Sequence, residues 1–507
     1  MAKSWVNSAE RIGADLHLEL SGTGGRRAAL IDALRAAVRG GRLAPGTRLP
    51  PYRSLAADLG VARNTVADAY AELVAEGWLT ARQGSGTRVA ERAQPLRTRP
   101  LRHDQRTQPP RHAENGPVTA PPRARAPRHD LRQGTPDASA FPRAAWLASY
   151  RRALQQAPDE VFGPGDPAGR LELREALTEY LARARGVRTT PDRIVICSGF
   201  AHGLRLLFGQ GGQGGQRGHL AQGGGVLRGP LAVEAYGLGF HRELLRAAGV
   251  RTVPLPIDEH GARVEELARE RAVLLTPAHQ FPTGGPLHAE RRAAVIDWAR
   301  ARGGVVLEDD YDGEFRYDRK PVGALQGLDP ERVIYLGSVS KSLSPALRLG
   351  WMVLPERYVE GVLAAKGERE AWVSVLDQLS LADFVSSGSY DRHVRRMRQR
   401  YRSRRDRLVA ALATHAPHIE VGGVAAGLHA VLRLPPGTER STLKAAAWQG
   451  VALDGLAAFR HPETATESQD GLVVGYATPS EAAFGAALEA LCEVLPPSGP
   501  TGVPAAG

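Results

Sequence analysis

The chain has 507 residues, 42 % of them hydrophobic, and a formal net charge of +12. The length suits about three folding units with a large core. The opening MAKSWVNSAERIG lacks the apolar core of a signal peptide, and no apolar run approaches the roughly 20 residues of a membrane span. Two cysteines exclude a disulfide framework in a chain of this size. We expect a soluble, cytoplasmic protein with no membrane partner.

The positive charge is concentrated at one end of the chain. Residues 1–90 carry a net +4 and residues 91–128 a net +6, which leaves only +2 for the remainder. A basic arm on a nearly neutral body is typical of a protein that contacts a polyanion with one end. A solubilising tail is the alternative.

The first elements in chain order predict a winged helix-turn-helix. Apolar residues of 26–40 recur at helical spacing, and two glycines end that helix. A short helix at 54–60 follows, with Ser54 at a plausible N-cap. The third helix lies within 61–78, and two short strands surround a Gly-Ser-Gly turn. We place this domain at 12–90. The apolar face of the third helix is expected to hold Val66, Tyr70, Leu73 and Val74.

The expected partner of this domain is a double-stranded DNA operator. In a helix-turn-helix the second helix enters the major groove, and its first turn reaches base edges. Arginine suits guanine and asparagine suits adenine there. A winged helix that binds protein is the alternative. The candidate DNA contacts are Arg63, Asn64 and Thr65 for bases, and Arg53, Gly84, Ser85, Gly86 and Thr87 for the sugar-phosphate backbone.

Three further segments are separated by composition. Residues 91–128 are rich in proline and arginine without periodicity, and we expect an extended linker. Residues 129–495 alternate short apolar strands with helices, which predicts an α/β domain with a mostly parallel sheet covered on both faces. A glycine- and glutamine-rich insertion at 209–225 reads as a surface loop, and 496–507 as a disordered tail. The expected strands are 194–199, 231–237, 272–279, 305–312 and 333–338.

The stretch GSVSKSLSPALRLG, residues 337–350, places Lys341 among serines directly after a strand. A lysine can form a Schiff base with the aldehyde of pyridoxal 5′-phosphate. Such a site also needs a carboxylate at the ring nitrogen, a donor to the ring hydroxyl, a phosphate cup and a flat group over the ring. Each of these has a candidate in 129–495. The sequence predicts no metal site.

The ring partners come from the strand ends. Asp309 and Tyr311 are two apart in the predicted strand 305–312, so both are expected on one face, toward the ring nitrogen and the ring hydroxyl. Tyr236 is the candidate to cover the ring, and His279 and Gln280 are placed near its hydroxyl. The phosphate candidates are Ser338, Ser340 and Arg348, and Ser198, Gly199, Phe200 and Ala201 at a strand-to-helix turn.

Each candidate has a structural alternative. A lysine near serines can be a solvated loop residue, the Asp-Asp-Tyr-Asp run a metal site or a surface acidic cluster, and the 198–201 turn an ordinary helix cap. The order of the parts, from the phosphate turn to SxxK with a trailing arginine, favours the cofactor site.

Two resemblances cover most of the chain. LPPYRSLAADLGVARNTVADAYAELVAEGWL resembles the DNA-binding domain of GntR-family regulators, with Tyr52 where a small residue is more usual. Residues 133–495, with TPAHQFPTG, EDDYDGEFRYD and VIYLGSVSKSLSPALRLG, resemble fold-type I aminotransferases. Together they look like the MocR subfamily, in which a winged helix is fused to an aminotransferase-like domain with a smaller C-terminal subdomain.

The resemblance implies roles for single residues. It makes Lys341 the Schiff-base lysine, Asp309 and Tyr311 the ring partners, and Ser338 and Arg348 phosphate ligands. It also implies a head-to-tail homodimer. We expect Arg460 to hold the carboxylate of an effector.

Some positions depart from the family pattern. Pro164 stands where a phosphate-reaching tyrosine is expected, and the strand GLVVGYA lacks the substrate-binding arginine of true aminotransferases. The leading hypothesis is therefore a transcriptional regulator that senses pyridoxal phosphate, or a small amino compound through aldimine chemistry at Lys341. An active aminotransferase with a DNA-binding appendage and a protein-interaction scaffold are the alternatives.

Overall fold

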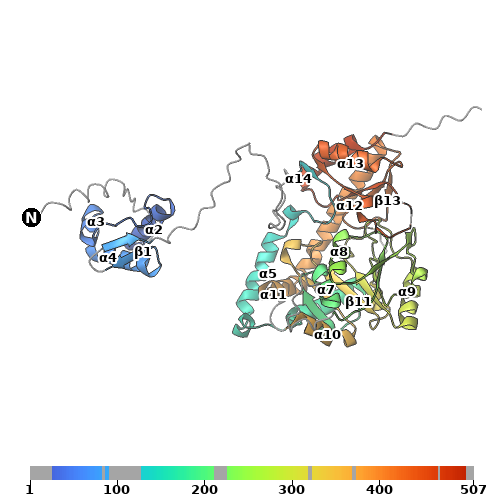
Figure 1. Cartoon of the computed structure of the whole chain (residues 1–507), viewed down its shortest axis with the longest axis horizontal. Coiled ribbons are helices and arrows are strands. Elements are labelled where there is room, and N and C mark those ends of the chain that lie inside the picture. The colour runs from blue at the N-terminus through green and yellow to red at the C-terminus, as the bar shows by residue number, and fades with distance from the viewer. Residues whose placement is uncertain are drawn as a thin grey trace, which may run out of the picture. The chain divides into compact units, whose positions relative to one another are not determined.

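The computed structural model describes residues 25–82, 86–90, 127–209, 225–317, 322–367, 373–465, 467 and 469–497. The chain divides into two compact units, Met1–Ala120 and Pro121–Gly507, each described here by itself (Figure 1). Gly84, Ser85, most of the predicted linker, most of the insertion and most of the tail lie outside the described residues. No described helix combines the length and the apolar character that crossing a membrane requires.

The N-terminal unit is a winged helix-turn-helix, as predicted. Its three helices pack around one apolar core, which contains Leu34, Leu55, Val66 and Tyr70. Two antiparallel strands complete the unit. The elements are α2 (Arg26–Arg39), α3 (Tyr52–Asp58), α4 (Arg63–Ala75), β1 (Leu79–Arg82) and β2 (Gly86–Val89).

One local expectation for this unit was wrong. The helix α3 begins at Tyr52, with Pro51 at the N-cap position, so Ser54 lies inside the helix and caps nothing. The cause is Pro51, whose fixed φ suits a helix start and whose carbonyl accepts from the Ser54 amide at 3.0 Å. On α4 the buried side chains are Val66, Ala69, Tyr70 and Leu73, and the half-buried Val74 packs against the same core, so the predicted apolar face is confirmed.

The C-terminal unit is built on a seven-stranded sheet in the order β4-β12-β11-β10-β9-β5-β6. Only β12 is antiparallel to its neighbours; the other pairs run parallel, as predicted. The strands are β4 (Ile194–Cys197), β5 (Leu231–Glu234), β6 (Thr252–Leu255), β9 (Ala272–Leu275), β10 (Val305–Asp309), β11 (Val333–Ser338) and β12 (Gly350–Val353).

Helices cover both faces of this sheet (Figure 1). Alternate strand residues point to opposite faces. One face packs Leu307 and Leu336 against α7, α8 and α10, and the other packs Val306 and Tyr335 against α6, α9 and α11. The helices of this part of the chain are α5 (Arg143–Gln156), α6 (Leu171–Arg185), α7 (Phe200–Phe208), α8 (Gly239–Ala247), α9 (Ala289–Arg302), α10 (Glu356–Lys366) and α11 (Val375–Ser386).

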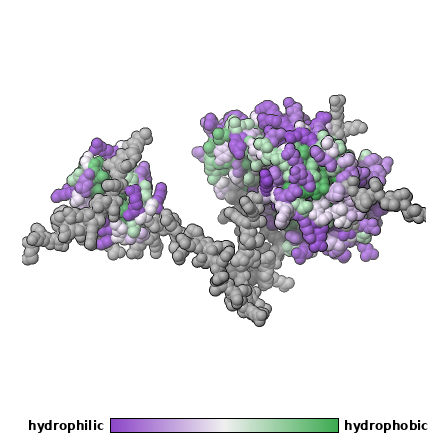
Figure 2. Space-filling model, turned by 90° about the horizontal axis from the view of Figure 1, so that it is seen from above, coloured by the Kyte–Doolittle hydropathy of each residue, from purple (hydrophilic) through white to green (hydrophobic). Residues whose placement is uncertain are grey.

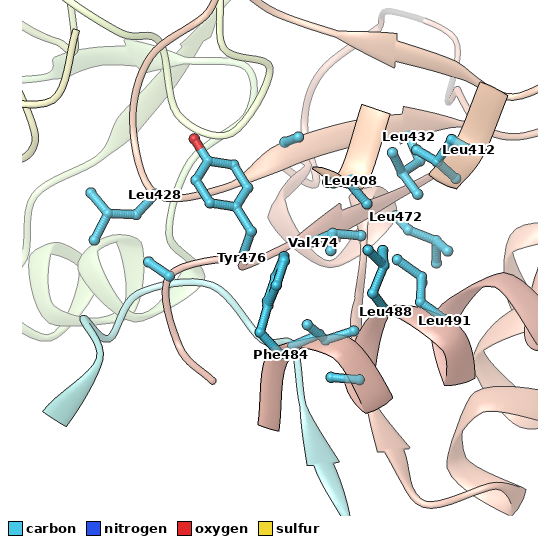
Figure 3. Close-up of a cluster of buried hydrophobic side chains, with 14 of the residues drawn as sticks. Leu408, Leu412, Leu428, Leu432, Leu472, Val474, Tyr476, Phe484, Leu488 and Leu491 are labelled. Atoms are coloured by element: carbon cyan, nitrogen blue, oxygen red, sulfur yellow. The ribbon is translucent and has the colours of Figure 1, made fainter. Parts of the chain in front are cut away.

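A smaller subdomain follows at the C-terminal end. Its four-stranded sheet, in the order β13-β14-β17-β16, packs Leu432, Leu472 and Val474 against Leu408 and Phe484 of two helices (Figure 3). The elements are α12 (Ser389–His415), β13 (Glu420–Gly422), β14 (Ala430–Arg433), α13 (Glu439–Trp448), β15 (Val451–Ala452), β16 (Asp454–Gly455), β17 (Gly471–Val474) and α14 (Glu481–Val494).

The segment before α5 belongs structurally to this subdomain. The strand β3 (His129–Asp130) pairs with β15, and Leu131 bonds through its backbone to Ala452 and Gly475. A further short hairpin is formed by β7 (Ile257–Asp258) and β8 (Gly261–Ala262).

Hydrophilic side chains cover most of the face in view, with hydrophobic patches between them (Figure 2).

Candidate functional site

A cavity of about 290 Å³ lies where β4, β5, β10 and β11 end. In a mostly parallel sheet these strand ends are the usual place for a ligand, because side chains from several strands converge there. The lining includes Lys341, Asp309, Tyr311, Tyr236, Ser338, Ser340, Arg348, Ser198, Gly199, Phe200 and Ala201. The structure therefore brings together eleven of the predicted cofactor-site residues.

Lys341 reaches into the cavity from the turn after β11. Its Nζ donates a hydrogen bond to the carbonyl of Gly134. Burial lowers the pKa of Lys341, and the carboxylates of Asp309 and Asp312 oppose this effect. A lowered pKa increases the fraction of neutral amine, which is the nucleophilic form of lysine.

Asp309 ends β10, and Tyr311 lies in the turn beyond it. The expectation that both residues are on the strand was therefore wrong, although both line the cavity. Burial raises the pKa of Asp309 well above its ordinary value, the neighbouring Asp310 carboxylate adds to this, and Lys341 opposes it. Within the described residues the Asp309 carboxylate has no hydrogen-bond partner, so it can bind a cationic N–H.

Tyr311 is held by residues behind the cavity. Its hydroxyl lies 2.9 Å from His279 Nδ1, which also contacts Asp312 Oδ2 at 2.8 Å. Burial and the carboxylate of Asp312 raise the pKa of Tyr311 well above its ordinary value, so the hydroxyl stays protonated and can donate.

The structure does not place His279 and Gln280 in the lining. Both side chains are buried behind it. Gln280 bonds to the Tyr236 and Phe281 carbonyls at 3.3 and 2.6 Å. Their direct contact with a ring hydroxyl is therefore not supported; His279 acts on that region through Tyr311.

The candidate phosphate cup combines a helix start with hydroxyl groups. The helix α7 begins at Phe200, after Gly199 with φ of 110°. The Ser198 amide already donates to His202 Nδ1 at 3.1 Å, which leaves the amides of Gly199, Phe200 and Ala201 for an anion. Ser338 and Ser340 contact each other through their hydroxyls at 2.7 Å. Arg348 is exposed, in a left-handed conformation with φ of 53°.

The other acids of the run 308–312 have structural partners. Asp310 forms a buried bidentate pair with Arg185, with contacts of 2.6 and 2.9 Å, and accepts from Tyr335 at 2.8 Å. Among the described residues, no group of three His, Cys, Asp or Glu side chains is arranged to hold a metal ion. The metal alternative for this run therefore has no support in that part of the chain.

Sequence reasoning missed several residues of the cavity. Gly134, Glu234, Arg242 and His429 also line it. Glu234 accepts from the Thr276 hydroxyl, and burial raises its pKa to about 7. Glu234 ends β5 but lies inside the longer strand predicted at 231–237, where an acid in an apolar run was a signal that could have been used. The others come from distant segments and carry no local signal.

Arg460 is not part of the lining. Its Nη2 donates to the Thr464 carbonyl at 2.9 Å, and its backbone forms an isolated bridge with Tyr236. The structure thus places Arg460 beside the wall that carries Tyr236 and gives its guanidinium a partner in the same turn.

The N-terminal unit presents its predicted base contacts at the start of α4. Arg63 and Asn64 are exposed and Thr65 is half-buried, and Arg53 is exposed on α3. Gly86 is exposed at the start of β2, with φ of 80°. Thr87 is only 7 % exposed, because the alternation of side chains along β2 turns it toward the core. The expected contact of its side chain with phosphate was therefore wrong.

The comparisons with known proteins agree with both units. Residues 26–89 match the family model "Bacterial regulatory proteins, gntR family", and residues 130–490 match "Aminotransferase class I and II". The chain is 33 % identical to the probable rhizopine catabolism regulatory protein MocR of Rhizobium meliloti, over 88 % of this chain and 89 % of that one. It is 30 % identical to the HTH-type pyridoxine biosynthesis transcriptional regulator PdxR of Corynebacterium glutamicum, over 89 % and 92 %.

Among solved structures, an archaeal alanine:glyoxylate aminotransferase superimposes with a TM-score of 0.63 at 21 % identity, covering 74 % of this chain and 91 % of that one. At this identity the similarity shows the fold alone. The family models and the curated relatives together show more. The chain belongs to the GntR-family HTH-type transcriptional regulators that carry an aminotransferase class I and II domain, the MocR subfamily.

Proposed function

We propose that this regulator binds pyridoxal 5′-phosphate in the cavity at Lys341 and that a small amino compound acts on it there to change operator binding. The observation that carries the proposal is the single cavity shared by Lys341, Asp309, Tyr311 and the phosphate candidates. The donor set fits the cofactor: an unpaired carboxylate, a protonated phenol and a helix start face one space. When bound, pyridoxal phosphate supplies an aldehyde that reacts reversibly with primary amines.

The residues of the chain have separate tasks in this proposal. With pyridoxal phosphate bound, Asp309 would pair with the ring nitrogen and Tyr311 would donate to the ring oxygen. Arg348 and the amides at the start of α7 would hold the phosphate, and Tyr236 would lie against the ring. Lys341 would supply the primary amine that reacts with the aldehyde, and an effector amine would compete with it.

The DNA-binding heads complete the proposal. Arg63, Asn64 and Thr65 are proposed to read base edges, with Arg53 and Gly86 on phosphates. In a cytoplasmic homodimer, the N-terminal unit of each subunit would lie against the C-terminal unit of the other. The two N-terminal units would then read two half-sites of the operator. The matching GntR model and the exposed start of α4 support this part.

The first test is the visible absorption of the purified full chain after pyridoxal phosphate is added. We expect a band that borohydride removes, present in the native chain and in Lys444→Ala but absent in Lys341→Ala. Lys444 is exposed on α13 and outside the cavity, so it controls for the loss of a lysine. The same band in Lys341→Ala, or no band in the native chain, would refute cofactor binding at this residue.

A further inference from the structure

A buried pair of titratable residues, His279 and Asp312, lies behind the cavity. His279 comes from the segment that follows β9, and Asp312 from the turn that follows β10. His279 Nδ1 contacts Asp312 Oδ2 at 2.8 Å and the Tyr311 hydroxyl at 2.9 Å. One ring nitrogen thus meets both a carboxylate and the phenol that is proposed to donate to the cofactor.

The carboxylate decides where the hydrogen of this ring nitrogen lies. A carboxylate only accepts hydrogen bonds, so the 2.8 Å contact with Asp312 requires a hydrogen on His279 Nδ1. Without that hydrogen, the lone pair of the nitrogen and the carboxylate would repel each other. The requirement holds for a neutral and for a charged imidazole, because in the charged form both ring nitrogens carry a hydrogen. His279 therefore donates at Nδ1 and cannot accept from Tyr311 there.

Two acceptors beside Tyr311 would otherwise compete for its proton. A bare His279 Nδ1 would accept it across 2.9 Å. The Asp312 carboxylate is also near enough to act on this hydroxyl, because after burial its charge is the strongest influence that raises the pKa of Tyr311. The hydrogen on Nδ1 fills the first acceptor and occupies the second. The hydroxyl proton of Tyr311 is thus left for an acceptor in the cavity.

The surrounding packing keeps the imidazole in this orientation. A Cβ atom at Gly427, which has φ of 76°, would collide with His279 Cε1 and would lie 2.7 Å from Asp312 Oδ2. The turn of the small subdomain that contains Gly427 thus closes directly over the pair. The ring of His429 lies 5.3 Å from that of His279, and its Nε2 donates to the Pro282 carbonyl at 3.0 Å. Burial lowers the pKa of His429 to about 4, so this neighbour is neutral near pH 7.

We infer that His279, with Asp312 as its acceptor, is a positioning residue that directs the proton of Tyr311 toward the ring oxygen of bound pyridoxal phosphate. The inference rests on the proposed function, since it needs the cofactor in the cavity. With the cofactor bound at Lys341, its ring oxygen and the lysine nitrogen share a proton whose loss changes the visible band. A hydrogen bond from Tyr311 weakens the hold of that oxygen on the shared proton. His279 thereby lowers the pH at which the proton leaves.

The test measures the pH midpoint of the cofactor's visible band in the full chain loaded with pyridoxal phosphate. Tyr311→Phe should raise the midpoint by about one to two pH units, the range of a hydrogen bond to a charged group. His279→Phe should raise it by about half a unit to one unit, because Asp312 is then free to accept the Tyr311 proton. In the Tyr311→Phe background, His279→Phe should add nothing. His415→Phe, at the exposed end of α12, is the matched control and should leave the midpoint unchanged.

The double variant separates positioning from a purely structural role. A residue that only supports the fold would shift the midpoint equally with and without the Tyr311 hydroxyl, and that result would overturn the inference. An unchanged midpoint in His279→Phe would overturn it as well. The acids Asp312, Asp309 and Glu234 stay in place, because their charges act on Tyr311 or Lys341 directly.

A second variant covers the case in which His279→Phe does not fold. The amide nitrogen of His279→Gln can donate to both Asp312 and Tyr311, so its midpoint should stay within about half a pH unit of the native value. A midpoint in His279→Gln as high as that of Tyr311→Phe would contradict the inference. No cofactor band in the native chain would instead refute the proposed function.

Discussion

At the scale of single residues, the cavity separates groups that bind from groups that position. Asp309 is the sharpest case, because its carboxylate has no described hydrogen-bond partner and yet is buried enough to have a raised pKa. Such a group costs free energy in the folded chain unless a ligand compensates it. Removing the charge of Asp309 should therefore weaken cofactor binding and should not destabilise the cofactor-free chain.

Asp309→Asn should weaken the affinity for pyridoxal phosphate by about tenfold to a hundredfold, since a charge-assisted hydrogen bond becomes a neutral one. The same substitution should leave the stability of the cofactor-free chain unchanged or raise it. Absorbance titration and thermal unfolding measure the two quantities. Asp297→Asn, at a carboxylate that is 76 % exposed on α9, is the matched control. Unchanged cofactor affinity in Asp309→Asn would contradict the assigned role.

Glu234 predicts a pH dependence of stability. Its pKa is raised by burial to about 7 in the folded chain, from 4.5 as the ordinary value. Protonated Glu234 therefore stabilises the fold fully below pH 4.5, and this contribution is lost as the pH rises through 7. Glu234→Gln cannot ionise. Its free energy of unfolding should rise relative to that of the native chain by up to about 1.4 kcal/mol per pH unit between these values, then level off.

The measurement is chemical denaturation of both chains from pH 5 to pH 8. A difference between Glu234→Gln and the native chain that does not change with pH would show that Glu234 is ionised throughout.

The sequence was sufficient for the site residues that lie at the ends of strands or in the segments that follow them. Lys341, Asp309 and Ser198 lie at the ends of apolar runs, and the parallel sheet brings such ends together. Gly134 lies 207 positions from the lysine that it contacts. Arg242 meets the carbonyls of a turn more than 200 positions away. Contacts of this kind are set by the packing of two subdomains, which no local pattern encodes.

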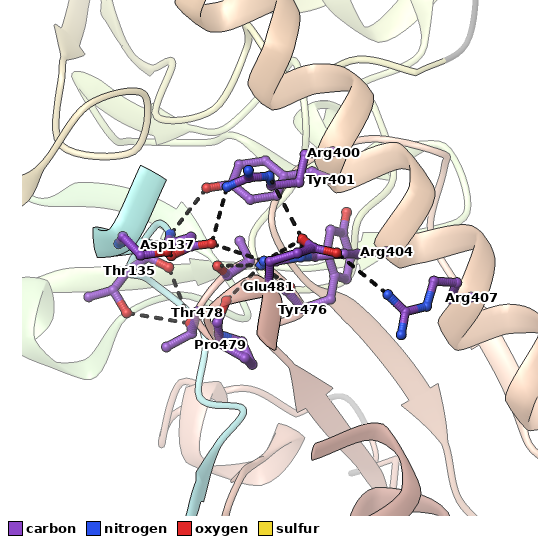
Figure 4. Close-up of polar contacts among 12 residues, drawn as sticks. Thr135, Asp137, Arg400, Tyr401, Arg404, Arg407, Tyr476, Thr478, Pro479 and Glu481 are labelled. Atoms are coloured by element: carbon purple, nitrogen blue, oxygen red, sulfur yellow. Dashed lines mark hydrogen bonds and ion pairs between the residues drawn. The ribbon is translucent and has the colours of Figure 1, made fainter. Parts of the chain in front are cut away.

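At the scale of elements, an arginine of α12 joins three parts of the small subdomain. Arg404 is 1 % exposed, and its Nη2 contacts Asp137 Oδ2 at 2.9 Å and Glu481 Oε2 at 3.0 Å (Figure 4). Its Nη1 donates to the Pro479 carbonyl at 2.8 Å. Asp137 belongs to the segment whose Gly134 carbonyl accepts from Lys341. Arg404 thus ties the cavity-lining segment to α12 and α14.

Arg404→Met should lower the free energy of unfolding by about 3–5 kcal/mol, because Asp137 would be left as a buried charge without its main partner. Arg402→Met, at an exposed pair with Asp406 on the same helix, should change it by less than about 1 kcal/mol. Urea denaturation of the two variants checks both values. Similar, small effects in both would show that Arg404 contributes little beyond its exposed neighbours.

The helix-turn-helix predicts two kinds of DNA defect. Arg63→Ala, at the start of α4, should cost about 1–3 kcal/mol on a preferred duplex and little on random DNA, because base contacts specify sequence. Arg53→Ala should weaken both and reduce the salt slope by about 1. The preferred duplex is obtained by selection from a random pool with the full chain. Equal losses on both duplexes for Arg63→Ala would place this residue on the phosphates instead.

The elements themselves were largely predictable. The periodicity of α2 and α4 and the apolar runs of β4, β5, β9, β10 and β11 gave their positions to within a few residues. The errors came from local chemistry at the ends: Pro51 starts α3 earlier than Ser54 would, and β10 stops at Asp309. Short strands such as β3 and β15 were not predicted, because they exist only through their pairing with each other.

At the scale of the whole molecule, the proposal requires that effector binding in the cavity and operator binding by the N-terminal units are coupled by one free energy. If bound cofactor and effector change operator affinity by some factor, bound operator must change the affinity for the effector by the same factor. We expect a factor of about 5 to 150, as in other coupled sites.

The test titrates the full chain with an acid-bearing amine, with and without a saturating amount of the selected duplex, and measures duplex binding at both effector extremes. Lys341→Ala should bind the duplex with one affinity at every effector concentration, because its cavity holds no reactive amine to displace. A change of DNA affinity in the native chain, with no change in the effector affinity read from the cofactor's absorbance, would mean that the effector acts at a site other than this cavity.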